Sequence, residues 1–175
     1  MDQARAAFSA RNYQASAQLA QQAIAMNPNG SQAYDLLGFI NFYQLGNYSE
    51  GVNLMQQAVA KGGSATFLVL HDMGDGSFSN RCTGYLKVSK TQVSFRSTSC
   101  NGDNFTTPVS DITEARPNRL SRLIPRSRGP RDLSVGAVVA NPFHIKTIHS
   151  NYNLAGSSRS SKAEMDAILD LVGRR

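Results

Sequence analysis

The spacing of hydrophobic residues changes twice along the chain. Up to about residue 61, apolar side chains recur three or four positions apart, the spacing of an amphipathic helix. From Ala65 to Ala155, short runs of β-branched and aromatic residues are separated by Gly, Asn and Pro, a pattern typical of strands and turns. After residue 160 the helical spacing returns. The pattern predicts helices, then a strand-rich region, then one closing helix.

The helical region contains one segment twice. Residues 12–25 (NYQASAQLAQQAIA) match residues 47–60 (NYSEGVNLMQQAVA) at a constant offset of 35 residues. A period of this length is typical of stacked helical repeats, in which each unit buries its apolar face against a neighbour. We expect helices over residues 1–26 and 31–61, interrupted by short turns.

The repeat resembles the tetratricopeptide repeat (TPR), a pair of antiparallel helices. In the second copy, Tyr34, Leu37 and Gly38 fit the first helix of the pair. Residues 46–50 (GNYSE) fit the turn between the helices, and Ala58 fits the small position late in the second helix. The resemblance covers residues 1–63.

Several positions depart from the TPR pattern. The segment 38–46 is one residue longer than usual, so we expect an adjustment in the helix or in its turn. Ser16 and Gly51 stand where the family usually has alanine. Residues 1–10 leave the first helix of the first copy short, and Met1 falls inside an expected helix, which suggests a fragment of a longer chain.

The TPR resemblance implies that residues of the first helix line the concave side of the array. The candidate partner-binding residues on that side are Asp35, Phe39, Phe42 and Tyr43. One interpretation is a groove for a peptide or protein partner. The alternative is that the aromatic residues are core, or are covered by the second half of the chain. The basic and Asn pattern with which some TPR proteins bind a peptide carboxylate is absent.

Seven strands are predicted after the short Gly62–Gly63 joint. Their ranges are Thr66–His71, Cys82–Val88, Gln92–Ser97, Asn104–Thr107, Val109–Ala115, Phe143–Ile148 and Tyr152–Ala155. Alternation of side chains places Leu86 and Val88 opposite Val93 and Phe95. A last helix follows, with a capping box at residues 161–164 (SKAE), an apolar stripe and a terminal Gly173.

Strands in groups of four and three, followed by one amphipathic helix, resemble the pleckstrin-homology-like (PH-like) barrel. The order is similar to PH-like domains that follow helical repeats in bacterial proteins. The expected fold is therefore α+β in two domains. Residues 1–63 are expected to form the TPR-like half. Residues 64–175 are expected to form a seven-stranded PH-like β-barrel with a C-terminal α-helix and a basic insertion at about 116–135.

That insertion carries the excess charge. The chain has 18 basic and 12 acidic residues, a net charge of +6, and residues 116–131 contain six arginines and no acid. The candidate anion-binding residues are Arg116, Arg119, Arg122, Arg126, Arg128 and Arg131. Guanidinium groups bind phosphate or carboxylate in a bidentate manner. A solvated loop and docking to an acidic protein surface are the alternatives, and nucleic acid is disfavoured because no aromatic residue interleaves.

Other chemistry is weakly represented. The segment between the first two strands contains Asp72, Asp75 and a single Arg81, which argues against an inositol-phosphate site. No catalytic, cofactor or metal site is predicted. Cys82 and Cys100 allow at most one disulfide, and strand alternation places them on different faces unless a bulge intervenes. Two ordinary thiols are the alternative.

The sequence therefore predicts a non-enzymatic interaction or scaffolding module, an adaptor that binds a protein or peptide through both halves. The alternative is a peripheral binder of anionic lipid or polyanion through residues 116–131. No run of 18 apolar residues predicts a transmembrane segment, and no signal segment precedes the first helix. These features favour a cytoplasmic location.

Overall fold

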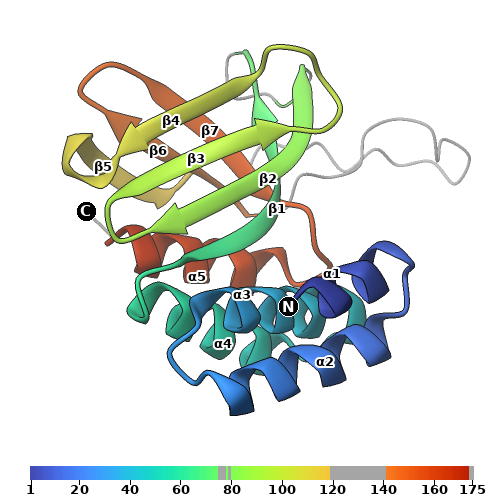
Figure 1. The fold of residues 1–175 in the computed structure, drawn as a ribbon. Helices are drawn as coiled ribbons and strands as arrows, with labels where there is room; N and C mark the ends of the chain where they lie inside the picture. Colours follow the sequence, from blue (N-terminus) through green and yellow to red (C-terminus); the bar gives the residue numbers. More distant parts are fainter. Residues whose placement is uncertain (75–77, 79, 119–140, 174–175) are drawn as a thin grey trace, which may run out of the picture.

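The computed structural model describes residues 1–74, 78, 80–118 and 141–173. The described part is α+β, with five α-helices and a seven-stranded antiparallel sheet. The helices are α1 (Asp2–Ser9), α2 (Tyr13–Met26), α3 (Ser31–Ile40), α4 (Tyr48–Ala60) and α5 (Ser161–Val172). The strands are β1 (Ser64–Asp72), β2 (Arg81–Ser89), β3 (Gln92–Ser97), β4 (Asn104–Pro108), β5 (Ile112–Pro117), β6 (Pro142–Thr147) and β7 (Asn151–Gly156). Helices α1–α4 form a layer against the sheet, and α5 lies between them (Figure 1).

Equivalent positions of the two repeated segments have the same backbone conformation. Arg11 (φ 59°) and Gly46 (φ 73°) are both left-handed, and each stands just before the N-cap of the following helix. The N-caps are Asn12 and Asn47. A left-handed backbone is uncommon for arginine because the Cβ crowds the backbone. The same conformation at the matching Gly46 therefore indicates that the turn itself requires it.

The extra residue in segment 38–46 is absorbed within the helix. Residues Asn41–Leu45 form a π-helix (η1) that continues directly from α3. A π-helix holds one more residue per turn than an α-helix and is the usual form of a single-residue insertion. The Asn41 side chain donates to the Leu37 carbonyl at 3.0 Å, and Asn47 donates to Asn41 Oδ1 at 3.1 Å. The expected local adjustment is confirmed.

Two glycines bring α3 and α4 into close contact. A Cβ at Gly38 would lie 2.9 Å from the Gly51 carbonyl oxygen, and a Cβ at Gly51 would lie 2.8 Å from Phe42 Cβ. No other residue fits at this separation without moving a backbone. The small residues predicted from the sequence pattern are therefore required by the helix crossing.

The strands follow the order β4-β3-β2-β1-β7-β6-β5. Leu86 pairs with Phe95 and Val88 with Val93, as alternation predicts. In the described residues no ladder joins β4 to β5, so the sheet is open where the sequence predicts a barrel. The short 3-10 helix η2 (Val109–Asp111) instead carries the chain from one edge to the other. The strand order and the terminal helix are consistent with a PH-like fold.

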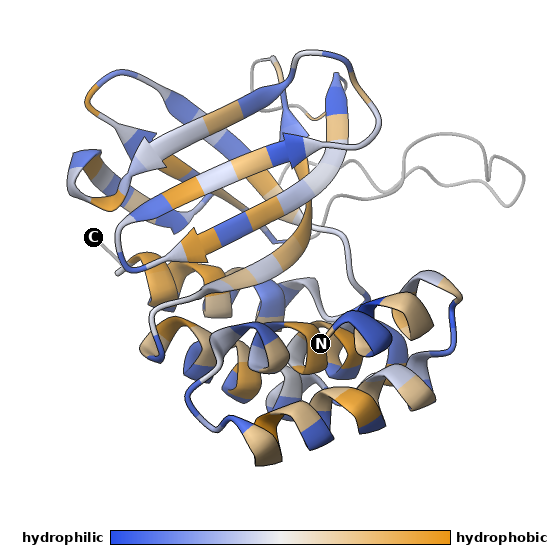
Figure 2. Ribbon diagram, in the orientation of Figure 1, coloured by the Kyte–Doolittle hydropathy of each residue, from blue (hydrophilic) through white to orange (hydrophobic). Residues whose placement is uncertain are grey.

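The two expected domains share one core. The apolar stripe of α5, which includes Met165, Ile168 and Leu169, packs into the main cluster with the inner face of the sheet. The same cluster takes in Phe42 and Met55 from the helical layer. Hydrophobic segments occur along α5, which lies between the sheet and the helices beneath it (Figure 2). The helical layer therefore packs, together with α5, against the sheet.

The predicted capping box of the last helix is wrong. The helix begins after Ser160, which forms no side-chain cap, so Glu164 is the fourth helical residue rather than the third. From that position Glu164 is fully buried, and its Oε2 accepts from the Ser158 N–H at 3.1 Å. Its other oxygen accepts from the Tyr43 hydroxyl. The side chain joins the helical layer to α5 instead of capping α5.

Cys82 and Cys100 form a disulfide, with a Cα–Cα distance of 5.6 Å. Cys82 lies in β2, whereas Cys100 lies in the loop that follows β3. Strand alternation therefore does not constrain the second cysteine, and no bulge is needed. Of the helices described, none combines the length and hydrophobicity needed to cross a membrane.

Candidate functional site

A cleft of about 550 Å³ lies between the helical layer and the outer face of the sheet. Its walls come from α1 and α3 on one side and from β1 and β2 on the other, and the junction between α4 and β1 completes it. The lining residues are Arg5, Phe8, Ser31, Gln32, Asp35, Leu36, Phe39, Gly62, Gly63, Ser64, Thr66, Tyr85 and Lys87. This volume falls in the range of ~300–1,000 Å³ that is usual for ligand sites.

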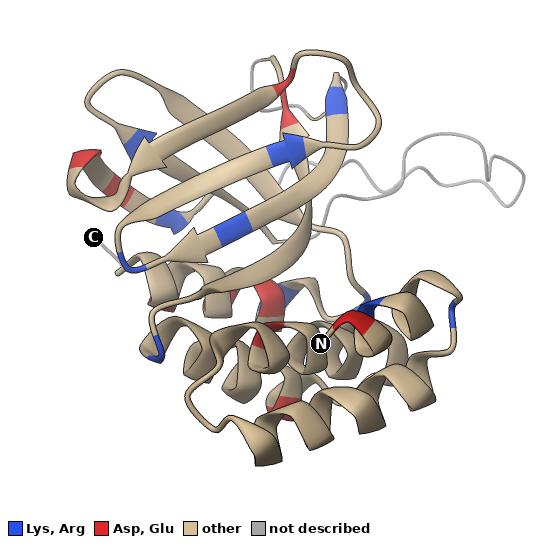
Figure 3. Cartoon of the chain, viewed as in Figure 1, with Lys and Arg blue, Asp and Glu red and all other residues tan. Residues whose placement is uncertain are grey.

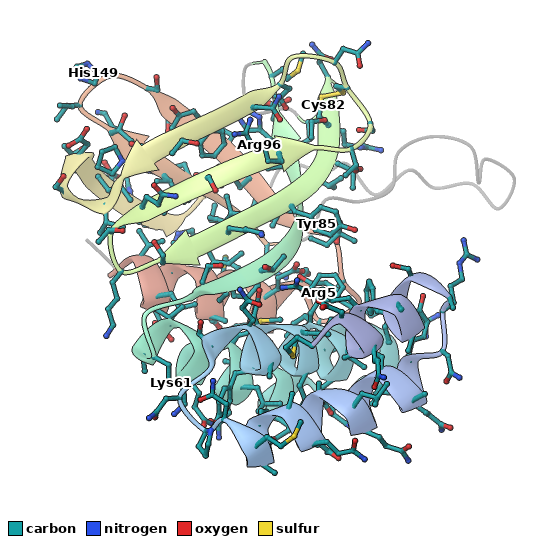
Figure 4. All side chains as sticks on the ribbon, in the orientation of Figure 1. Arg5, Lys61, Cys82, Tyr85, Arg96 and His149 are labelled. Atoms are coloured by element: carbon teal, nitrogen blue, oxygen red, sulfur yellow. A yellow bond between two sulfur atoms is a disulfide. The ribbon has the colours of Figure 1, made fainter. Side chains whose placement is uncertain are left out.

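Aromatic rings from both layers form one wall of the cleft. Phe8 of α1 meets Phe39 of α3 edge-on, with ring centroids 5.8 Å apart. Phe39 in turn lies 6.1 Å from Tyr85 of β2, whose side chain is 39% exposed. Tyr85 and Arg5 project from opposite layers toward the same space (Figure 4). The wall offers apolar surface with a hydroxyl at its open side.

Three basic side chains surround this wall. Arg5 Nη2 donates to Gln32 Oε1 at 2.8 Å, a neutral partner. Lys87 lies on β2 opposite Thr66, and Arg96 lies on β3 directly opposite Tyr85. Strands β2 and β3 carry basic residues and no acidic ones (Figure 3). Within the described part of the chain, no carboxylate lies within 4.0 Å of these three cations.

Asp35, at the base of the cleft, binds the edge of β1. Its Oδ1 accepts from the Thr66 N–H and its Oδ2 from the Thr66 hydroxyl, both at 2.8 Å. Burial raises the pKa of Asp35, and the two Thr66 bonds partly oppose that rise. The carboxylate is therefore already occupied by the chain itself.

A second helical side chain binds the same strand edge. Strand β1 pairs with β7 only from Val69 to Asp72, so no strand in the described part of the chain pairs with its first half on that side. There the Leu68 N–H donates to the Tyr43 hydroxyl at 2.8 Å, two residues along from Thr66. Because an unpaired strand edge is a site for association with other strands, these helical side chains act as its cover.

The four candidate partner-binding residues thus contact the chain itself. Phe39 and Phe42 are buried, 8% and 1% exposed, within the main core. Asp35 and Tyr43 hold β1, and only Asp35 and Phe39 also border the cleft. The three aromatic residues therefore agree with the alternative interpretation, in which they are core or are covered by the second half of the chain.

Of the six candidate anion-binding arginines, only Arg116 falls within the described residues. Its Nε donates to Glu114, and the same Glu114 oxygen lies 3.1 Å from His144 Nε2. His144 and Arg116 together lower the pKa of Glu114. Arg119, Arg122, Arg126, Arg128 and Arg131 lie outside the described residues.

The end of β1 and the segment that follows it also make polar contacts. His71 Nδ1 lies 2.9 Å from Asp103 Oδ2, and Arg81 donates to the Phe78 carbonyl at 3.1 Å. Asp72 stands opposite Arg81 in the β1–β2 register, and Asp75 lies outside the described residues. In the parts of the chain described, no group of three or more His, Cys, Asp or Glu side chains could hold a metal ion.

Of the basic and aromatic residues that line the cleft, the sequence predictions included Phe39 but missed Arg5, Phe8, Tyr85 and Lys87. Tyr85 and Lys87 alternate with the buried Leu86 and Val88, so their exposed position could have been recognised from β2 alone. Arg5 offers no such signal. Its place opposite β2 depends on the helical layer folding back over the sheet, which no local pattern indicates.

No family model matches this chain, and no curated protein matches it. Among solved structures, the C-terminal domain of an unknown protein from Leishmania infantum is similar at 17% identity and a TM-score of 0.39, covering 61% of this chain and 80% of that one. The N-terminal PH domain of the human ARAP2 protein is similar at 10% identity and a TM-score of 0.38, covering 63% and 80%.

Proposed function

We propose that this chain is a non-enzymatic interaction module that binds a protein or peptide partner in the cleft between the helical layer and the sheet. The observation that supports this most is the combination of the exposed Tyr85, beside the aromatic wall, with cations that form no salt bridge among the described residues. Exposed aromatic and basic side chains are the groups most often responsible for binding energy at protein interfaces.

The helical layer is best explained as two TPR-like hairpins. The matching left-handed turns at Arg11 and Gly46 and the matching Asn N-caps support this interpretation. The sheet with α5 is the PH-like unit. In this proposal the two units are not independent binders, because the cleft exists only where they meet. An origin among bacterial proteins of this organisation remains a prediction.

The lining of the cleft favours binding over catalysis. Asp35 is the one carboxylate among the lining residues, and both of its oxygens accept hydrogen bonds from Thr66. A general base must be free to reach a substrate proton. Ser31 and Ser64 also line the cleft, and the lining residues that the structure describes include no histidine, so they contain no serine–histidine pair.

A peptide-display selection with a matched counter-selection tests the proposal. Peptides would be selected on the wild-type chain and then screened against Leu36→Trp, which fills the cleft, and Ile148→Trp, which places the same bulk at an exposed turn. We expect selected peptides to lose binding to Leu36→Trp and to keep it with Ile148→Trp, both variants melting close to wild type. Peptides that bind all three proteins equally would show that the cleft is not the site.

The sequence-level alternative, anion binding by residues 116–131, gains no specific support. Arg116 is the only one of the six arginines described, and it is paired with Glu114. A separate anion-binding role therefore remains a prediction, and it would be distinguishable because none of the lining residues given for the cleft belongs to 116–131.

A further inference from the structure

We infer that the ligand of this cleft is an acidic, extended segment of a partner protein with an aromatic side chain between its carboxylates. This inference rests on the proposed function and specifies the class of partner. It follows from the placement of charge on two neighbouring strands and on α1, and from the aromatic wall between them.

Basic residues lie on both sides of the cleft. Arg96 stands directly opposite Tyr85 across the β2–β3 ladder, and Lys87 is two residues from Tyr85 on the same face of β2. Arg5 lines the opposite wall of the cleft. Tyr85 therefore has a cation beside it on each of β2 and β3, and a third cation lies on the helical side of the cleft. Charge complementarity at such a surface selects an acidic partner and speeds its association.

These cations are available to a ligand. Lys87 and Arg96 are exposed, and Arg5 is exposed apart from its bond to Gln32. Each described salt bridge lies elsewhere in the molecule: at His71, at Arg116 and His144, and at Lys162. A ligand carboxylate would therefore not have to break any of the described salt bridges.

The position of Asp35 argues against a densely charged polyanion. It is the one acid among the lining residues, it lies at the base beside Thr66, and Lys87 is close enough to influence its titration. A chain of phosphates laid into the cleft would meet this negative charge. A peptide can place carboxylates at Lys87 and Arg96 and turn an uncharged side chain toward the base.

The apolar wall identifies that uncharged side chain as aromatic. Phe8, Phe39 and Tyr85 present ring faces and edges at centroid separations of 5.8 and 6.1 Å. Aromatic pairs prefer such offset and edge-on arrangements. Among the described residues Tyr85 has one ring neighbour, Phe39, and at 39% exposure it retains accessible surface for a second ring.

Fluorescence anisotropy with defined peptides tests the inference. The probes are labelled, end-capped nonapeptides: GEDEFEDEG, its amide counterpart GQNQFQNQG, and GEDEAEDEG without the aromatic residue. Measurements are made at about 50 mM and about 300 mM NaCl, because screening weakens exposed charge contacts. The proteins are wild type, Lys87→Gln/Arg96→Gln, and Lys146→Gln, which removes an exposed charge from β6.

We expect wild type to bind GEDEFEDEG at least about fivefold more tightly than either other peptide, and to lose most of this preference at high salt. The double variant should lose about fivefold in affinity, whereas Lys146→Gln should match wild type. The exposed positions of Lys87 and Arg96 allow both proteins to fold, which thermal unfolding would verify.

Several outcomes would overturn the inference. Equal binding of the acidic and amide peptides would leave the cleft as a peptide site but not one for acidic segments. Acidic binding that is unaffected in the double variant would place the site elsewhere. Oligo-dT binding that depends on Lys87 and Arg96, without peptide binding, would identify nucleic acid instead. The proposed function itself fails only if the cleft-filling variant Leu36→Trp retains every selected ligand.

Discussion

A buried carboxylic acid joins the helical layer to α5. Glu164 is fully buried, and it accepts from the Tyr43 hydroxyl and from the Ser158 N–H. Tyr43 in turn accepts from the Leu68 N–H of β1. Removal from water raises the pKa of Glu164 from 4.5 to about 7 and also raises the pKa of Tyr43. This short chain of hydrogen bonds connects η1, β1 and α5.

Stability should therefore depend on the protonation of Glu164. Its pKa is higher in the folded state than in the unfolded state, so its contribution is fully present below about pH 4.5 and is lost as the pH rises through about 7. The difference corresponds to about 3 kcal/mol. Urea unfolding would be measured at several pH values between about 4.5 and 8. As the pH rises, the unfolding free energy of wild type should fall relative to that of Glu164→Gln. A difference between the two proteins that does not change with pH would contradict this role.

The hydrogen bonds between Asp35 and Thr66 give a second prediction about a single residue. Both oxygens of Asp35 accept from Thr66, one from the N–H and one from the hydroxyl. Asp35→Ala removes both acceptors and leaves the Thr66 N–H without this partner, which should cost ~1–3 kcal/mol of unfolding free energy. Chemical denaturation at neutral pH measures the loss. No loss would mean that these hydrogen bonds do not hold the β1 edge.

At the scale of elements, local patterns predicted local structure well. The β2–β3 register follows from alternation, Gly62 and Gly173 are left-handed as expected of helix ends, and the extra residue in 38–46 appears as η1. The capping box failed because a serine one residue earlier begins α5. The sequence pattern S-x-x-E cannot distinguish these two starts without knowing where Glu164 packs.

The α3–α4 crossing offers a test of packing against propensity. Alanine favours a helix over glycine by about 1 kcal/mol, so an exposed Gly→Ala change in a helix stabilises. At Gly38 the added Cβ would lie 2.9 Å from both the Gly51 carbonyl oxygen and Met55 Cγ. We expect Gly38→Ala to destabilise by ~1–3 kcal/mol in chemical denaturation. A stabilised variant would show that the helices can separate without cost.

At the scale of the whole molecule, the shared core determines what the sequence could not reveal. Phe42 and Asp35 were predicted to face a partner because a TPR-like array presents that side. In the structure β1 and α5 cover it, and the cleft that we propose as the binding site lies beside Tyr85 instead. Such long-range docking depends on surfaces that are distant in sequence.

The shared core predicts a single unfolding transition. Phe42 and Met55 of the helical layer are fully buried in the cluster that contains Leu169 of α5. Separating the layers would expose all of them at once, so neither layer should melt alone. Calorimetry of the full chain should give one transition with equal calorimetric and van't Hoff enthalpies. Two resolved transitions would indicate the independent domains expected from the sequence.

The disulfide bears on where the protein functions. Disulfides persist in oxidising compartments and are rare in the cytosol. The Cys82–Cys100 bond therefore favours an oxidising environment over the cytoplasmic location expected from the sequence, and we propose such a location. Under reducing conditions the loop between β3 and β4 would lose this covalent link to β2.

The most direct test of the ligand-binding cleft is an NMR titration of the isotopically labelled full chain with the peptide GEDEFEDEG. We predict that the amide chemical shifts of Phe8, Leu36, Tyr85 and Lys87 change, while that of His149, on a remote turn, stays unchanged. Shift changes confined to the arginine-rich residues 116–131, with none at Tyr85 or Lys87, would contradict it.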